Sequence, residues 1–236
     1  MEKQLSDLLT RLKTAFGGSL VSVILYGSAA MDDWNEKSSD LNILCVLQQL
    51  SPAELAQSEP VLRWWRGLGN PSPLLLTGEE VLTSTDCFPM EFHDMQEHRR
   101  VLFGTDLIRD LTIDRSFYRA QVEHELRSKQ IRLRQKAAEL LPDSDRLLTL
   151  MVDSISTFCV LGRHALILSG HEPRWKKPEI VSALERALNR GLPSCNEILA
   201  IRGNPTVTAN TDVVLLLGQY LGEMDLLVRF VDGLEK

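Results

Sequence analysis

The sequence is poor in the residues that stabilise small secreted proteins or bind zinc. It has 236 residues but only 4 cysteines and 5 histidines. The cysteines are far apart, without a C-x-x-C pair, and the histidines do not show the spacing of metal ligands. This pattern is typical of reduced thiols in the cytosol and argues against a disulfide framework or a zinc site. The start of the chain is charged and amphipathic rather than a signal peptide, so we expect a cytoplasmic protein.

Positive charge is also scarce. Lysine and arginine total 26 against 32 aspartate and glutamate, which gives a net charge of −6 and an isoelectric point near 5.4. This balance argues against a protein that binds a long nucleic acid. One apolar stretch, residues 213–231, could be mistaken for a membrane span, but its Glu223, Asp225 and Arg229 are costly in a bilayer. We expect a buried closing helix there and no membrane partner.

The most informative segment runs from Tyr26 to Val46 and reads YGSAAMDDWNEKSSDLNILCV. The apolar, β-branched residues 20–26 predict a buried strand that stops at Gly27, with a helix beginning at Ser28. A tight glycine turn lets the backbone approach a ligand closely, and a serine hydroxyl beside it can donate to phosphate oxygens. Gly27 and Ser28 are therefore candidate phosphate-binding residues.

Asp40 and Asn42 enter a second predicted strand, residues 40–47. Residues two apart on a strand point to the same face, so these two side chains project together while Leu41 and Ile43 point into the core. Two oxygen ligands beside a phosphate site suggest Mg²⁺, or Mn²⁺ in its place.

These residues carry a resemblance to a known family. Gly27-Ser28 followed by Asp40-x-Asn42 resembles the nucleotidyltransferase superfamily, which includes DNA polymerase beta and the aminoglycoside nucleotidyltransferases. The family signature is Gly-Ser, a spacer, and Asp-x-Asp on a strand, so Asn42 replaces the second aspartate. The resemblance implies that Asp40 and Asn42 bind the metals that hold a nucleoside triphosphate. The amide of Asn42 has no charge, so it binds a metal ion less well than a carboxylate does. Catalysis with two metal ions is weakened more than nucleotide binding with one, because two dications must share fewer negative ligands.

The family adds a third carboxylate from a neighbouring strand. The sequence DCFPMEFHDM, residues 86–95, alternates apolar and polar side chains and predicts a half-buried strand over residues 88–94. We expect Glu91 to be the third metal ligand or the general base, with Asp94 and Asp86 as alternatives.

Helix and strand patterns divide the chain into two parts. Residues 1–111 alternate helices and short strands, with helices at 2–16 and 51–66 and another strand at 74–77. Residues 112–236 contain no predicted strand and form four or five helices. The predicted fold is α+β: a small polymerase-beta-like α/β domain followed by a helical bundle. This layout also resembles the aminoglycoside nucleotidyltransferases.

The predicted function is transfer of a nucleoside monophosphate from a magnesium-bound nucleoside triphosphate to a hydroxyl of a small molecule or protein, with release of pyrophosphate. The alternative is a catalytically degenerate member of the same fold that binds nucleotide or a partner, which Asn42 favours. A third option is an antitoxin-like transferase that modifies a partner protein. The acceptor, the preferred base and the oligomeric state, including a homo-oligomer, stay open at this point.

Overall fold

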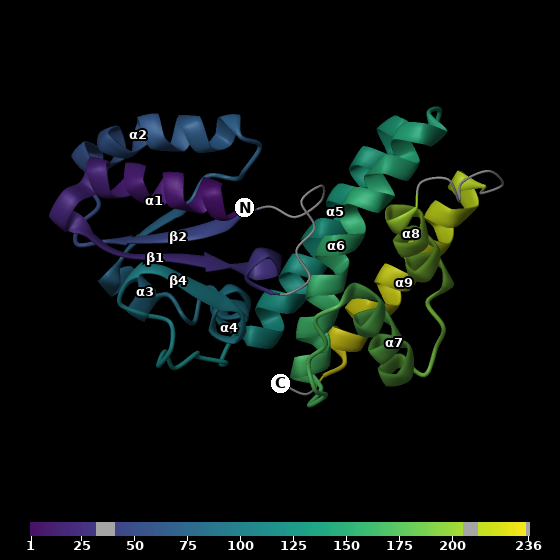
Figure 1. Cartoon of the computed structure of the whole chain (residues 1–236). Coiled ribbons are helices and arrows are strands. Elements are labelled where there is room, and N and C mark those ends of the chain that lie inside the picture. Colours follow the sequence, from purple (N-terminus) through teal and green to yellow (C-terminus); the bar gives the residue numbers. More distant parts are fainter. Residues whose placement is uncertain (32–40, 205–211, 235–236) are drawn as a thin grey trace. The chain divides into compact units, whose positions relative to one another are not determined.

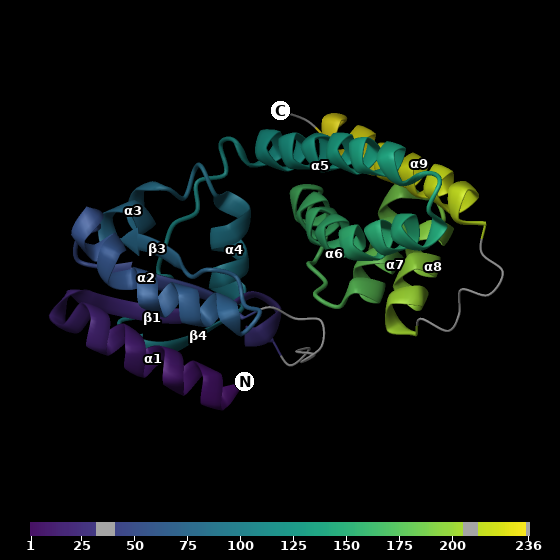
Figure 2. The same ribbon diagram turned by 90° about the horizontal axis from the view of Figure 1, so that it is seen from above.

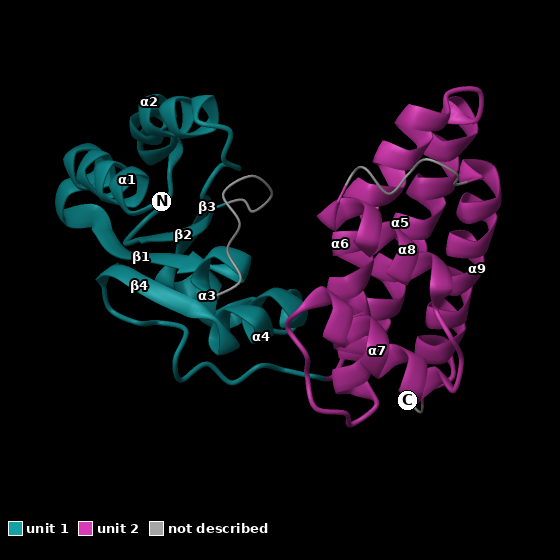
Figure 3. Cartoon of the chain, turned by 45° about the vertical axis from the view of Figure 1, so that its right-hand side comes forward, with its two compact units in different colours: residues 1–115 teal, residues 116–236 magenta. Residues whose placement is uncertain are grey.

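The chain divides into two compact units, residues Met1–Arg115 and Ser116–Lys236 (Figure 3). The computed structural model describes residues 1–31, 41–204 and 212–234. The sequence placed the boundary four residues earlier, between residues 111 and 112. Each unit has its own core, and each is described by itself below.

The first unit is built on a small mixed sheet. Four strands lie in the order β3-β2-β1-β4; β1 pairs antiparallel with both β2 and β4, and β2 pairs parallel with β3. The elements in chain order are α1 (Glu2–Phe16), η1 (Gly17–Ser19), β1 (Leu20–Tyr26), η2 (Gly27–Ala30), β2 (Asn42–Leu47), α2 (Pro52–Gly67), β3 (Leu74–Thr77), α3 (Gly78–Thr83), α4 (Pro89–Glu97) and β4 (Arg99–Gly104).

Helices cover both faces of this sheet (Figure 1). On one face, α1 and α2 bury their apolar residues, with Trp65 fully buried, against alternate strand residues such as Leu25 and Ile43. On the other face, α3 and α4 pack on Ile24 and Leu44. Successive strand residues therefore serve two different cores, which explains why β1 and β2 read as continuous apolar runs.

The segment predicted as an acidic strand is a helix. Residues 88–94 fall mostly within α4, which begins at Pro89 and buries Met90, Phe92 and Met95. Proline is well suited to the first turn of a helix because its fixed φ fits and its missing N–H would have no partner there. The alternation of residues 88, 90 and 92 looked like a strand only because that window is shorter than two helical turns. The strand prediction is wrong, and Glu91 lies in the first turn of α4.

The fourth strand is β4, which the sequence analysis did not predict. It starts with two arginines that both form ion pairs: Arg100 pairs with Glu2, 98 residues away, at 2.9 Å, and Arg99 pairs with Asp106, 7 residues further on, at 2.8 Å. It ends at Gly104, where φ is +77° and a Cβ would lie 1.9 Å from the carbonyl oxygen of Val21. Only glycine allows β4 to approach β1 so closely at this point.

The second unit is a bundle of helices (Figure 2). Its described helices are α5 (Tyr118–Leu140), α6 (Ser144–Leu168), α7 (Lys177–Leu188), α8 (Pro193–Gly203) and α9 (Val213–Asp232). Among the described helices, α6 is the one long and apolar enough to cross a membrane by length and composition, and 56% of its most apolar window is buried inside the protein. The stretch singled out in the sequence lies instead in α9.

Two buried polar contacts order the bundle. Glu223 of α9 is 6% exposed, and its carboxylate accepts hydrogen bonds from the backbone N–H groups of Ser194 (2.8 Å) and Cys195 (2.9 Å) at the start of α8. The hydroxyl of Tyr118 lies 2.6 Å from Nδ1 of His164, which joins the first turn of α5 to α6. A carboxylate at a helix start satisfies N–H groups that have no partner within the helix.

The four cysteines differ in exposure. Cys45, Cys159 and Cys195 are buried, whereas Cys87, in the turn before α4, is exposed. Burial raises the pKa of the Cys45 and Cys159 thiols to about 12, and it also raises the pKa of Cys195. These three thiols are therefore protonated and unreactive at neutral pH.

Candidate functional site

One end of the sheet in the first unit carries three of the candidate site residues: Gly27, Ser28 and Asn42. Strand β1 ends at Tyr26, which pairs with Asn42 at the start of β2 and with Arg99 at the start of β4. Side chains directly opposite one another on neighbouring strands point to the same face. Tyr26 and Asn42 therefore lie on the face that packs against α3 and α4, at the edge where β1 turns into Gly27.

Strand β1 ends in a tight glycine turn, as the sequence predicts, but a single 3₁₀ turn follows in place of the helix expected from Ser28. Gly27 has a φ of +75°, and a Cβ placed on it would lie 3.2 Å from Nδ2 of Asn42. The side-chain amide of Asn42 therefore lies directly against the α-carbon of Gly27. Ser28 follows in η2, a single 3₁₀ turn that begins at Gly27, and its carbonyl accepts a hydrogen bond from the Met31 N–H at 3.2 Å. Two of the predicted phosphate and metal residues, Gly27 and Asn42, are in contact.

Asp40 lies outside the described residues, which resume at Leu41. Leu41 and Ile43 are 2% and 1% exposed and pack in the core beneath α1 and α2, as expected, while Asn42 is half-buried on the opposite face. The alternation in β2 is therefore confirmed from residue 41 onward.

The third carboxylate does not come from a strand. The two strands that flank β1 and β2 read LLLT in β3 and RRVLFG in β4, and neither contains aspartate or glutamate. Glu91 lies on α4. Burial raises the pKa of Tyr26, and the negative charge of Glu91 raises it further. The expectation of a strand-borne carboxylate is wrong, but Glu91 and Tyr26 are electrostatic neighbours.

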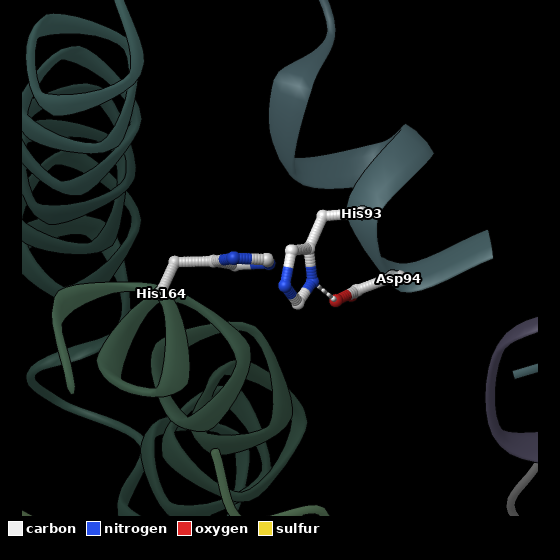
Figure 4. A group of neighbouring side chains, drawn as sticks. All are labelled: His93, Asp94 and His164. Carbon is white, nitrogen blue, oxygen red and sulfur yellow. Dashed lines mark ion pairs between the residues drawn. The ribbon is translucent and has the colours of Figure 1, made fainter. Parts of the chain in front are cut away.

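The two alternatives to Glu91 lie in different surroundings. Asp94 lies one turn further along α4, and its carboxylate is 3.7 Å from Nδ1 of His93 (Figure 4). The side chains of His93 and Asp94 are 11% and 20% exposed. The third labelled residue in that view, His164, belongs to the second unit and bonds Tyr118 there. Asp86 lies in the turn before α4, where a hydrogen bond with its side chain, and then its charge, raise the pKa of the neighbouring Cys87.

Arg99 is a basic residue at this end that the sequence analysis did not consider. Its guanidinium donates to both carboxylate oxygens of Asp106 and to the carbonyl oxygen of Gln96. Asp106 also accepts the N–H groups of Ile108 and Arg109. Hydrogen bonds from Arg99 hold the pKa of Asp106 below its ordinary value. Arg99 is therefore engaged in anchoring the segment after β4 rather than pointing its donors at a ligand.

The sheet, the glycine turn and the helices of the second unit form an α+β fold. The fold is similar to that of a spectinomycin adenyltransferase, AAD(9), from Enterococcus faecialis, whose structure was determined with ATP and spectinomycin. The two chains superpose with a TM-score of 0.61 over 95% of this chain and 99% of the other, at 13% sequence identity. No protein-family model and no curated protein sequence matches this chain. The predicted fold class is thus confirmed, and the similarity concerns the fold rather than the residue at position 42.

Proposed function

We propose that the first unit binds a nucleoside triphosphate at the Gly27–Asn42 end of its sheet and that the chain acts as a nucleotidyltransferase. The observation that supports this most is the contact between the Asn42 amide and the α-carbon of Gly27. It brings the glycine turn and the second strand together at one point, as phosphate binding beside a metal requires. The solved chain of the same fold was crystallised with ATP.

The donor set suits magnesium. Mg²⁺ binds oxygen ligands and is commonly held by one or two carboxylates together with the phosphates of the substrate. Asp40, Asn42 and Glu91 would supply two carboxylates and one amide oxygen. When bound, the metal would neutralise phosphate charge and orient the leaving group. The backbone at Gly27 and the hydroxyl of Ser28 would hold phosphate oxygens.

The reaction assigned to this site is nucleotidyl transfer to a hydroxyl. The acceptor oxygen attacks the α-phosphorus, a new P–O ester bond forms, and the bond to the β-phosphate breaks with release of pyrophosphate. Glu91 would take the acceptor proton. Such a reaction depends on positioning and charge neutralisation more than on covalent participation of the protein. The acceptor is a small molecule or a protein that carries a hydroxyl.

The second candidate is a nucleotide-binding protein without transferase activity. It is favoured by the neutral Asn42 and by the absence of carboxylates from both β3 and β4. A site with fewer negative ligands holds two dications less well, so nucleotide binding would persist while the chemistry is lost.

A nucleotide screen separates the two candidates. ATP, GTP, CTP and UTP are titrated by calorimetry with Mg²⁺ or Mn²⁺, and pyrophosphate release is followed with a panel of hydroxyl acceptors. Binding with turnover supports the transferase, binding without turnover supports the degenerate member, and no binding contradicts both. Asp40→Ala is the matched variant, because loss of this carboxylate is expected to abolish metal-dependent binding while the variant stays folded by circular dichroism.

A further inference from the structure

The last residue of β1, Tyr26, has a side-chain hydroxyl that makes no hydrogen bond in the part of the chain that the structure describes. The chain has three tyrosines. The hydroxyl of Tyr118 lies 2.6 Å from Nδ1 of His164, and that of Tyr220 lies 3.1 Å from the hydroxyl of Ser154. A tyrosine hydroxyl that is taken out of bulk water usually finds a hydrogen-bond partner, so Tyr26 differs from the other two.

The ring of Tyr26 is held in place while its hydroxyl stays accessible. The side chain is half-buried and packs against the core beneath α3 and α4, which includes Ile24 and Leu44. Its oxygen keeps some contact with solvent, so a ligand can reach it. The phenol carries its proton at neutral pH, because its ordinary pKa is near 10 and burial raises it. Tyr26 therefore presents a donor that loses little freedom when a ligand binds.

The strand register places Tyr26 between two other polar side chains. Tyr26 pairs with Asn42 of β2 on one side and with Arg99 of β4 on the other, and directly opposite residues share a face of the sheet. The guanidinium of Arg99 is used within the chain, by the Asp106 carboxylate and the Gln96 carbonyl. The side chain of Asn42, like that of Tyr26, makes no hydrogen bond to any described residue. Two neighbouring donors on this face are therefore left for a ligand.

These donors lie beside the glycine turn. Nδ2 of Asn42 is 3.2 Å from the position of a Cβ on Gly27, the residue that follows Tyr26. Ser28 comes next, and its hydroxyl also makes no hydrogen bond within residues 1–31, 41–204 and 212–234. The Cβ atoms of directly opposite strand residues are about 4.5–5.5 Å apart, so Tyr26 and Asn42 can reach one ligand. A phosphate group suits such a set of donors, because its oxygens accept several hydrogen bonds and its charge strengthens each of them.

We propose that Tyr26 is a further substrate-binding residue, whose hydroxyl donates a hydrogen bond to a phosphate oxygen of the bound nucleoside triphosphate. The role of Tyr26 rests on the proposed function, because it requires a triphosphate at the Gly27–Asn42 end of the sheet. It adds a donor on β1 itself to those of the turn, and a donor on a strand is positioned more precisely than one on a loop. Tyr26 binds the substrate without entering the chemistry, so no bond to its oxygen forms or breaks.

Removal of the hydroxyl tests this role. Tyr26→Phe keeps the ring and its packing, so it should leave the melting temperature unchanged and raise the Kd for ATP with Mg²⁺ about 10- to 100-fold. Tyr220→Phe is the matched control, because it removes a hydroxyl that is bonded within the second unit. It should lower the melting temperature and leave the affinity for ATP unchanged. A Tyr26→Phe variant that melts at a lower temperature but binds ATP like the wild type shows that the hydroxyl is structural and overturns the proposal.

Inorganic triphosphate tests whether the contact is to phosphate. With Mg²⁺ present, Tyr26→Phe should weaken the binding of inorganic triphosphate and of ATP by the same factor. An unchanged affinity for inorganic triphosphate with a weakened affinity for ATP would place the hydroxyl at the nucleoside and overturn the phosphate contact.

The wild type and Gly27→Val separate a failure of this role from a failure of the proposed function. If the wild type binds ATP and Gly27→Val does not, while Tyr26→Phe binds like the wild type, the nucleotide site stands and the role of Tyr26 is wrong. If the wild type binds neither ATP nor inorganic triphosphate, the proposed function is wrong and the role of Tyr26 is overturned with it.

Discussion

The side-chain amide of Asn42 lies against the α-carbon of Gly27, with Nδ2 3.2 Å from the position that a Cβ on residue 27 would take. The contact joins two segments that are separated in the sequence by residues 28–41. Any side chain at position 27 therefore disturbs both the turn and the side chain of Asn42. The first two predictions depend on this contact.

Substitutions in the glycine turn should weaken nucleotide binding to different degrees. Gly27→Val forces a β-branched residue into a left-handed conformation and pushes its Cβ against Asn42, so we expect triphosphate binding to be lost. Ser28→Ala removes one hydroxyl donor, worth about 0.5–1.5 kcal/mol, or up to about 3 kcal/mol to a charged phosphate. Gly18→Ala is the control, because a Cβ there meets nothing within 4 Å. Calorimetric titration ranks the three, and a larger loss for Ser28→Ala than for Gly27→Val would exclude the turn as the phosphate site.

Asn42→Asp places a carboxylate at position 42 at nearly constant shape. With Mn²⁺ or Mg²⁺ present, it should tighten metal binding and raise nucleotidyl transfer. Without metal, repulsion from Glu91 and Asp40 should lower stability by on the order of 1 kcal/mol. Thermal melting with and without Mn²⁺ measures both effects, which have opposite signs. If metal affinity and melting temperature match the wild type in both buffers, Asn42 does not line a metal site.

Glu91→Gln should lower the pKa of Tyr26. Burial is the larger cause of the raised pKa of this phenol, and the negative charge of Glu91 adds to it. Removing the charge should therefore bring the pKa part of the way down while leaving it above the ordinary value. NMR titration of ring-labelled tyrosine follows Tyr26, with Tyr220 as the internal control, since its pKa is raised mainly by burial in the other unit. An unchanged Tyr26 titration would place Glu91 away from this end of the sheet.

Asp106 should make the first unit sensitive to acid. Its pKa in the folded protein is lowered below the ordinary value of 3.8, chiefly by hydrogen bonds from Arg99. A lowered folded pKa means that this stabilisation is complete above the unfolded pKa and is lost as the pH falls through the folded pKa. Asp106→Asn should therefore be less stable than the wild type at pH 7, and the difference should shrink below about pH 4. Urea unfolding across this pH range measures the difference in stability between the two proteins. A difference that does not depend on pH would contradict a stabilising role of the Asp106 charge.

Glu223→Ala should destabilise the second unit. It leaves the N–H groups of Ser194 and Cys195 buried without their acceptor, at a cost of about 1–3 kcal/mol. Asp225→Ala on the same helix removes only an ion pair with Arg229, whose side chain is 77% exposed, and should cost less than about 1 kcal/mol. Urea unfolding monitored by circular dichroism compares the two. Equal losses would mean that the carboxylate of Glu223 contributes no more than a surface pair.

The sequence predicted the elements that local residue patterns determine. Strand β1 was placed at residues 20–26, where the structure has it, because a β-branched apolar run ends at a glycine. Helix α2 was placed from Ser51, whose side chain accepts the N–H of Ala53 and whose backbone N–H donates to Glu54. In each case the residues that carry the signal lie within a few positions of one another. The signal can therefore be recognised without knowledge of tertiary contacts.

The two failures have different physical origins. α4 was read as a strand because three alternating apolar residues outweighed the proline at its first position, although Phe92 and Met95 also have helical spacing. β4 was missed because it begins with arginines, and the ion pairs that bury part of these side chains come from Glu2 and Asp106. The partner of Arg100, 98 residues away, cannot be recognised from neighbouring residues. Glu91 was predicted on a strand and lies on α4, and its role as third metal ligand or general base stays a prediction.

The unequal exposure of the four thiols gives the protein a natural attachment point for a fluorescent probe. A maleimide dye at mildly alkaline pH should react with Cys87 alone, because Cys87 is exposed whereas the other three thiols are buried. Cys87 lies in the turn before α4, four residues ahead of Glu91. A dye at this position reports events at the first turn of α4 in the wild-type chain, so the proposed nucleotide binding can be tested by fluorescence without any engineered cysteine.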